Sequence, residues 1–185
     1  LNNYFCTNRH AGLNKPVYRM LHRKMIYTIY RTQQIPASLD EAWDFFSSPG
    51  NLTRITPPDM GFRIQNRNEL EKMYPGQIIH YKVRPLWNIP VNWTTEITHV
   101  QQPYYFVDNQ LAGPYRLWHH QHHFKEIPGG VEMTDIVNYA LPAGFLGRLM
   151  HRPLVRKRLE DIFNYRVEAV NDLFGSLKKP TNTEN

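Results

Sequence analysis

"PLVRKRLEDIFNYRVEAVNDLFGSL" occupies residues 153–177 and is the most regular stretch of the sequence. Apolar residues recur in it every three or four positions, and mostly charged residues fill the intervals. These apolar residues are Val155, Leu159, Ile162, Phe163, Val167, Val170, Leu173, Phe174 and Leu177. Their spacing keeps them on one face of an α-helix for about six turns. The stretch therefore predicts a long amphipathic helix with Pro153 in its first turn, and the rest of the chain has to cover its apolar face.

The first elements of the domain are predicted to be one strand and short helices. Residues 25–36, MIYTIYRTQQIP, alternate β-branched and aromatic side chains and predict a strand that ends at its proline. In the following SLDEAWDFFSS, Ser38 is the expected N-cap of a short helix, and Glu41 three positions later completes a capping box. NLTRIT, residues 51–56, predicts one further helical turn.

The middle of the chain has the pattern of a β-meander. Turns rich in glycine and proline separate the strand candidates, which are residues 61–67, 77–84, 91–99, 104–110, 116–127 and 131–140. The order is thus strand, short helices, six strands and long helix. It predicts an α+β fold in which a curved antiparallel sheet of about seven strands wraps around the C-terminal helix, because each covers the apolar face of the other.

Three motifs in this order carry a resemblance to a known family. They are WDFFSSPGNLTRITPPDMGF (43–62), FVDNQLAGPYRLWHHQHHF (106–124) and DIVNYALPAGFLGRLMHRPLVRKRLEDIFNYR (135–166). Residues 25–178 resemble the SRPBCC (START-like, helix-grip) superfamily, and more narrowly an uncharacterised bacterial ligand-binding subfamily with polyketide cyclase/dehydrase-like relatives. The resemblance implies a helix-grip fold with a deep cavity for an apolar or amphipathic small molecule. It implies no single activity, because this fold serves many functions.

Length and charge indicate one domain flanked by two extensions. The 185 residues suit a single core, which we expect at residues 25–178, with a frayed tail at 179–185. Residues 1–24 contain five of the 22 basic residues and none of the 16 acidic ones, although the whole chain has a net charge of +6. We expect this segment to be a loosely ordered basic extension. The nearly neutral remainder argues against a nucleic-acid partner.

Cysteine content and hydropathy bear on the cellular compartment of the protein and on its association with membranes. Cys6 is the single cysteine, so the chain cannot form an intramolecular disulfide, which fits a reducing cytoplasm. No apolar run in the sequence reaches the ~20 residues needed to cross a bilayer, so we expect no stable membrane insertion.

The stretch WHHQHHF, residues 118–124, places four histidines in five positions. Neighbouring residues of a strand point to opposite faces, so the four histidines form two pairs. His120 and His122 share a face with the large aromatic residues Trp118 and Phe124. We therefore predict that this pair points to the cavity and that the other pair, His119 and His123, points to solvent.

The following hairpin brings Asp135 to the same face. If Gly129 and Gly130 form a two-residue loop, Asp135 lies opposite Phe124. If Pro128 and Gly129 form the loop, Asp135 lies opposite His122 instead. In both cases Asp135 and His122 are direct or diagonal neighbours within reach of a hydrogen bond.

Three interpretations of this inward group stay open. The side chains can satisfy one another as a polar patch, orient a polar group of a bound molecule, or bind a metal ion. His-x-His on a strand gives two ligands on one face, but a third ligand is only conjectural, with Asp135 or Glu96 as candidates. We expect no metal and no cofactor.

The predicted function is binding of a small hydrophobic or amphipathic molecule between the sheet and the C-terminal helix. The predicted ligand-binding residues are Tyr81, Trp93, Phe106, Trp118, His120, His122, Asp135, Tyr139 and Phe163. One alternative is a cyclase or dehydratase that uses His120, His122 and Asp135 for acid–base chemistry. Another is a regulatory module that acts on an unidentified protein partner. The sequence contains no phosphate-binding glycine motif and no GxSxG nucleophile motif.

Overall fold

A computed structural model describes residues 25–65, 72–142 and 151–177 of the chain. Its main feature is one antiparallel sheet of seven strands in the order β1-β7-β6-β5-β4-β3-β2. The strands are β1 (Tyr27–Ile35), β2 (Arg63–Ile64), β3 (Gln77–Val83), β4 (Val91–Gln101), β5 (Tyr105–Ala112), β6 (Leu117–Ile127) and β7 (Gly130–Ala140). Consecutive strands from β2 to β7 are neighbours, as in a meander, and β1 joins the free edge of β7.

The short helices follow strand β1 as predicted. Helix α2 (Leu39–Phe46) begins with the capping box: Ser38 Oγ accepts the Glu41 N–H, and the Ser38 N–H donates to Glu41 Oε2 at 2.8 Å. Two 3₁₀ helices come next, η1 (Pro49–Ile55) and η2 (Pro58–Met60). They lead into β2, which has two residues where the sequence predicted a strand over residues 61–67, and residues 66 and 67 lie outside the described part.

The long C-terminal helix α4 (Lys157–Phe174) starts later than predicted. A π-helical turn, η4 (His151–Arg156), contains Pro153 and precedes the regular helix. Proline has no N–H to donate to an α-helical ladder, which is consistent with the later start. Helix α4 ends before Gly175, whose N–H donates to the Asn171 carbonyl at 2.8 Å, so Leu177 lies beyond the helix. Residues 143–150, which precede this turn, lie outside the described part of the chain.

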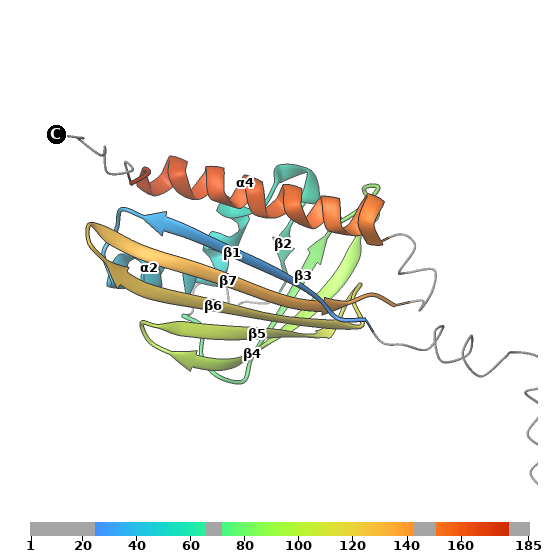
Figure 1. The fold of residues 1–185 in the computed structure, drawn as a ribbon. Helices are drawn as coiled ribbons and strands as arrows, with labels where there is room; N and C mark the ends of the chain where they lie inside the picture. The colour runs from blue at the N-terminus through green and yellow to red at the C-terminus, as the bar shows by residue number, and fades with distance from the viewer. Residues whose placement is uncertain (1–24, 66–71, 143–150, 178–185) are drawn as a thin grey trace, which may run out of the picture.

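Figure 1 shows how the sheet holds the helix. Helix α4 lies across one face of the sheet, and the strands β2 and β3 curl up toward it from the far edge. The α+β prediction of a curved sheet that wraps around the C-terminal helix is confirmed. No helix in the described part of the chain is long and apolar enough to cross a membrane.

The core between sheet and helices is divided into clusters of buried residues. One cluster packs helix α2 against the sheet and includes Trp43, Phe106 and Phe124. A second lies under the first half of α4 and includes Val137, Tyr139, Leu159 and Phe163. A third surrounds Met60, Val83 and Trp93 near β3 and β4. Members of all three clusters line one cavity between the sheet and the helices.

Candidate functional site

Strand pairing places two histidines and two aspartates in a square on the inner face of the sheet. Asp108 of β5 lies directly opposite His120 of β6. Asp135 of β7 lies directly opposite His122. The β6–β7 register is the one in which Pro128 and Gly129 form the turn, since Ile127 pairs with Gly130. That alternative of the hairpin prediction is confirmed.

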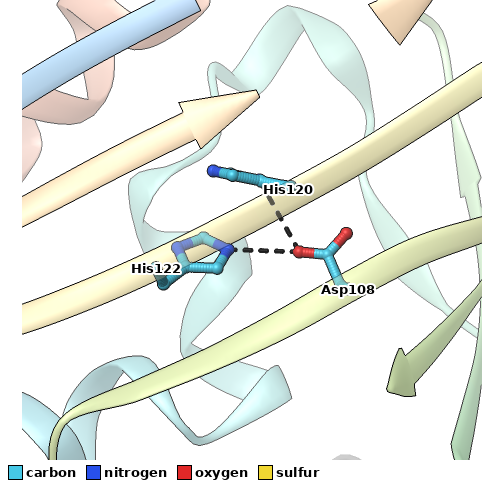
Figure 2. Close-up of side chains that lie close together, drawn as sticks. All are labelled: Asp108, His120 and His122. Carbon is cyan, nitrogen blue, oxygen red and sulfur yellow. Dashed lines mark hydrogen bonds and ion pairs between the residues drawn. The ribbon is translucent and has the colours of Figure 1, made fainter. Parts of the chain in front are cut away.

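The hydrogen bonds of this square run along its diagonals. His120 Nε2 donates to Asp135 Oδ1 at 2.8 Å, and His122 Nε2 donates to Asp108 Oδ2 at 3.1 Å. The remaining ring nitrogens also face carboxylates, because His120 Nδ1 lies 3.6 Å from Asp108 Oδ2 and His122 Nδ1 lies 2.9 Å from Asp135 Oδ1. The second of these contacts lacks the alignment of a hydrogen bond. Figure 2 shows both histidine rings beside the Asp108 carboxylate.

Arg166 of helix α4 completes the cluster from the opposite layer. Its Nη1 lies 3.4 Å from Asp135 Oδ1, and its guanidinium lies 5.3 Å from the centre of the Phe163 ring. Both charged side chains are almost fully buried, with 12% of Arg166 and 8% of Asp135 exposed. A buried ion pair with this little exposure is strongly sensitive to the loss of either partner.

The buried charges shift the pKa values of the cluster in different directions. Burial would raise the pKa of both carboxyls, but the neighbouring cations and the histidine hydrogen bonds outweigh it. The pKa of Asp108 is therefore lowered, and that of Asp135 lies well below its usual value, chiefly because of Arg166. Both carboxyls are thus ionised at neutral pH.

The pKa values of the two inner histidines are shifted in opposite directions. Burial, together with the charge of His122, lowers the pKa of His120. Burial also acts to lower the pKa of His122, but the hydrogen bond to Asp108 and the close Asp135 carboxylate outweigh it and raise that pKa. Neighbouring groups whose pKa values are pushed apart in this way are suited to exchange protons with a bound molecule.

Aromatic rings fix the histidines from several sides. Phe106 stacks on His122 with ring centres 4.2 Å apart, and Trp118 and Phe163 present their rings edge-on to His120. The outer histidines His119 and His123 lie on the opposite face of β6 and are half-buried. The predicted division of the four histidines between two faces is confirmed.

A cavity of about 150 Å³ lies between the sheet, helix α4 and the short helices. Seven of the nine residues predicted to bind a ligand line it: Tyr81, Trp93, Phe106, Trp118, His120, His122 and Phe163. Asp135 lies behind the two histidines and does not belong to the lining. Tyr139 is also outside the lining, because it packs in the core cluster under α4. The binding role of all nine stays a prediction.

The lining is mostly apolar, and two of its donors are unpaired. Trp93 Nε1 and Arg166 Nε are buried and have no hydrogen-bond partner among the described residues. By contrast, the Tyr81 hydroxyl is hydrogen-bonded to Thr95 Oγ1 at 2.5 Å, and burial first, then the charge of Asp108, raises its pKa. An unpaired buried donor is unfavourable by roughly 1–3 kcal/mol, so both donors favour an acceptor atom in the cavity.

Solved structures with low sequence identity share this architecture. Protein Ms6760 from Mycobacterium smegmatis matches with a TM-score of 0.59 at 16% identity, over 79% of this chain and 89% of that chain. Major latex-like protein 151 from Panax ginseng matches with a TM-score of 0.59 at 12% identity, over 80% and 97%. The di-domain ARO/CYC BexL from the BE-7585A biosynthetic pathway matches with a TM-score of 0.62 at 14% identity, over 88% of this chain and 54% of that chain. The chain shares the helix-grip fold of these structures, a curved antiparallel sheet that encloses a long C-terminal helix.

This likeness concerns the fold alone, because the identities are low. No family model matches the sequence, and no curated protein is similar to it in sequence. Any ligand of this helix-grip cavity must therefore be inferred from the side chains of this chain.

Sequence reasoning missed two members of the helix-grip site, Asp108 and Arg166. Asp108 follows Phe106 by two positions on a predicted strand, so alternation places both on one face. Arg166 lies three residues after Phe163 and four before Val170, which is the spacing of the apolar stripe of α4. A charged residue at a core position of that stripe was the available signal.

Asp108, His120 and His122 could also hold a metal ion. Each offers one ligand atom, and these atoms lie within 4.8 Å of one another. Asp108 thus takes the place that the sequence analysis gave to Asp135 or Glu96. Glu96 lies on β4 between Thr95 and Ile97, which are buried on the inner face, so it points away from the cavity.

Proposed function

We propose that this chain binds a small apolar or amphipathic molecule in the helix-grip cavity and orients it through one polar group. The observation that carries the proposal is a mostly apolar lining interrupted on one side by the Asp108, His120, His122 and Arg166 cluster. Apolar pockets with a few convergent polar groups are typical ligand sites.

The size of the cavity restricts the part of the ligand that is enclosed. A dry apolar cavity of about 150 Å³ accommodates a molecule such as benzene. The enclosed part is therefore about one six-membered ring, and a larger ligand has to extend beyond the cavity or displace side chains around it. The unpaired N–H groups of Trp93 and Arg166 favour a ring that carries an acceptor oxygen.

Burial of one ring gives only moderate affinity. An aromatic ring with about 150 Å² of buried surface gains about 4 kcal/mol at about 25 cal/mol per Å² before the costs of association. A hydrogen bond to a buried donor adds about 1 kcal/mol. Because association itself costs several kcal/mol, we expect dissociation constants in the millimolar range or weaker for a one-ring phenol and tighter binding for a ligand that also contacts the rim.

Native mass spectrometry of freshly purified protein, followed by calorimetry with p-cresol, tests the proposal. Ile162 of α4 lines the cavity and is half-buried, so Ile162→Trp should fill it and weaken p-cresol binding at least tenfold. Leu173→Trp is the matched control, because Leu173 lies on the same helix, is 37% exposed and does not line the cavity. Equal affinities of the two variants would rule out this cavity as the binding site.

The separation of the two histidine pKa values favours a second candidate function, acid–base catalysis of the cyclase or dehydratase type. Its test uses the co-purifying ligand and compares its chemical fate in wild type and His122→Gln. If the ligand is converted, loss of a general base should lower the rate by roughly 10² to 10⁴ fold while binding persists. Recovery of the ligand unchanged from wild type supports the binding function instead.

A further inference from the structure

The two inner histidines present four ring nitrogens to only two carboxylate oxygens, Asp108 Oδ2 and Asp135 Oδ1. All four ring nitrogens of His120 and His122 lie between 2.8 and 3.6 Å from an aspartate oxygen. A histidine that donates from both nitrogens must be a cation. The two ring centres are only 3.8 Å apart, so two cationic rings would repel each other in a buried site.

At least one ring is therefore neutral, and a neutral ring has a single N–H. Its other nitrogen points a lone pair at a carboxylate oxygen, which is repulsive unless a cation lies between them. His120 Nε2 already donates to Asp135, so in a neutral His120 ring Nδ1 is the nitrogen without a proton. This nitrogen makes the longest of the four contacts, at 3.6 Å from Asp108 Oδ2.

We propose that Asp108 Oδ2, His120 Nδ1 and His122 Nε2 bind one divalent first-row transition-metal ion such as Zn²⁺ or Fe²⁺. Both rings then are neutral and give one lone pair to the ion. Their remaining N–H groups are on His120 Nε2, which is hydrogen-bonded to Asp135 Oδ1 at 2.8 Å, and on His122 Nδ1, which lies 2.9 Å from the same oxygen without the alignment of a hydrogen bond. A carboxylate that accepts the second N–H of metal-bound histidines is the usual support of such sites.

The spacing of the ligand atoms fits this ion. Ligands at about 2.1 Å in tetrahedral geometry lie about 3.4 Å from one another. The two measured edges are 3.1 Å from His122 Nε2 and 3.6 Å from His120 Nδ1, both to Asp108 Oδ2. Each of the three residues offers one ligand atom, and these atoms all lie within 4.8 Å of one another. Two imidazoles and one carboxylate are a ligand set of zinc and of non-haem iron.

Charge and position give the ion open coordination positions toward the cavity. All three ligand residues line the cavity, so an ion there is reached from inside it. The ion, Arg166 and the two aspartates together have a net charge of about +1 when the histidines are neutral. An anionic or strongly polar oxygen donor, such as a phenolate or carboxylate, is the chemical class that this position would take.

Titration of the chelator-treated 185-residue protein with Zn²⁺ in a calorimeter tests the proposal. We expect the wild-type protein to bind one equivalent of Zn²⁺. The Asp108→Asn variant should bind Zn²⁺ at least 100-fold more weakly. Asp135→Asn should weaken the same binding about 10- to 100-fold, because it removes only the support of the two histidines. The double variant His119→Gln, His123→Gln removes the outer pair of the same strand and should bind as wild type.

A measurement on the wild-type protein keeps the test independent of whether the variants fold. Co²⁺ added to one equivalent should broaden or shift the NMR signals of His120 and His122 strongly and those of His80 and His99, which lie on β3 and β4 and outside the lining, far less. Equal binding by Asp108→Asn, loss of binding in the outer-pair variant, or no selective effect of Co²⁺ on the inner pair would each overturn the proposal.

Discussion

Asp135 receives contacts from His120, His122 and Arg166, all at its Oδ1 atom. One buried oxygen thereby links two strands to the helix that the sheet encloses. The carboxylate compensates the charge of Arg166, which otherwise has a buried Nε without a partner in the described chain. Removal of either charge leaves the other unpaired in a region of low polarity.

A double-mutant cycle on Asp135 and Arg166 tests this link. Asp135→Ala should lower the free energy of unfolding by about 3–5 kcal/mol, because Arg166 then stays buried without its carboxylate. The double variant with Arg166→Met should be less destabilised than the sum of the single variants, with a coupling of at least about 1 kcal/mol. Urea denaturation of the wild type, the two single variants and the double variant gives the four free energies of unfolding.

Glu132→Ala is the control for the cycle, since Glu132 is on the same strand but points to the other face. We expect a change within about 0.5 kcal/mol. Additive effects of the two inner substitutions would show that Asp135 and Arg166 do not depend on each other.

At the scale of elements, the β6–β7 turn decides where the inner side chains meet. Gly129 has a left-handed φ of 84°, and an added Cβ at Gly130 would lie 2.1 Å from the Ile35 carbonyl oxygen of β1. Glycine is therefore required at residue 130 by the close approach of a neighbouring strand rather than by its own backbone.

Substitution of two glycines separates the effect of a close contact from the effect of a left-handed backbone conformation. Gly130→Ala should lower the free energy of unfolding by about 3 kcal/mol, because β1 or the turn has to move. Gly76→Ala should lower it by only about 1 kcal/mol, since Gly76 has a φ of 86° but no atom within 4 Å of the added Cβ. Thermal and urea unfolding give the comparison, and equal losses would contradict the role assigned to the contact with Ile35.

The same turn explains what the sequence could predict of the site. A two-residue hairpin restricts pairing to a few registers, so His122 and Asp135 were predicted as neighbours. Residues 113–116 connect β5 to β6 by a longer loop, which does not set the register, so the pairing of Asp108 with His120 could not be predicted. Arg166 was missed for another reason: periodicity shows which face of a helix is inward but not which buried partner accepts a charge there.

At the scale of the whole molecule, the first strand in the described part of the chain is the edge strand β1. Met25 and Ile26 before it are 45% and 60% exposed, and the pairing with β7 begins at Tyr27. The sequence order alone predicted the curved sheet and the enclosed helix, because both depend on the hydrophobic pattern of complete elements. The dimensions of the cavity depend on side-chain packing and could not be predicted in that way. A cytoplasmic location stays a prediction.

Deletion of residues 1–24 tests the predicted boundary of the domain. The described contacts of β1 begin after this segment, so we expect the melting temperature to change by no more than a few degrees. The isoelectric point should fall, because the segment carries five basic residues and no acidic one. A larger loss of thermal stability, measured by circular dichroism at the same salt concentration, would place part of the segment in the folded domain.

The alternation of WHHQHHF on β6 has a consequence for sequence change in this strand. An insertion or deletion of one residue ahead of it would exchange the two faces, so that Gln121 and only one of the outer histidines would take the positions of the inner pair. Trp118 and Phe124 would at the same time be turned out into water. The reading frame of this strand is therefore fixed twice, by the aromatic residues at its two ends and by the histidines between them.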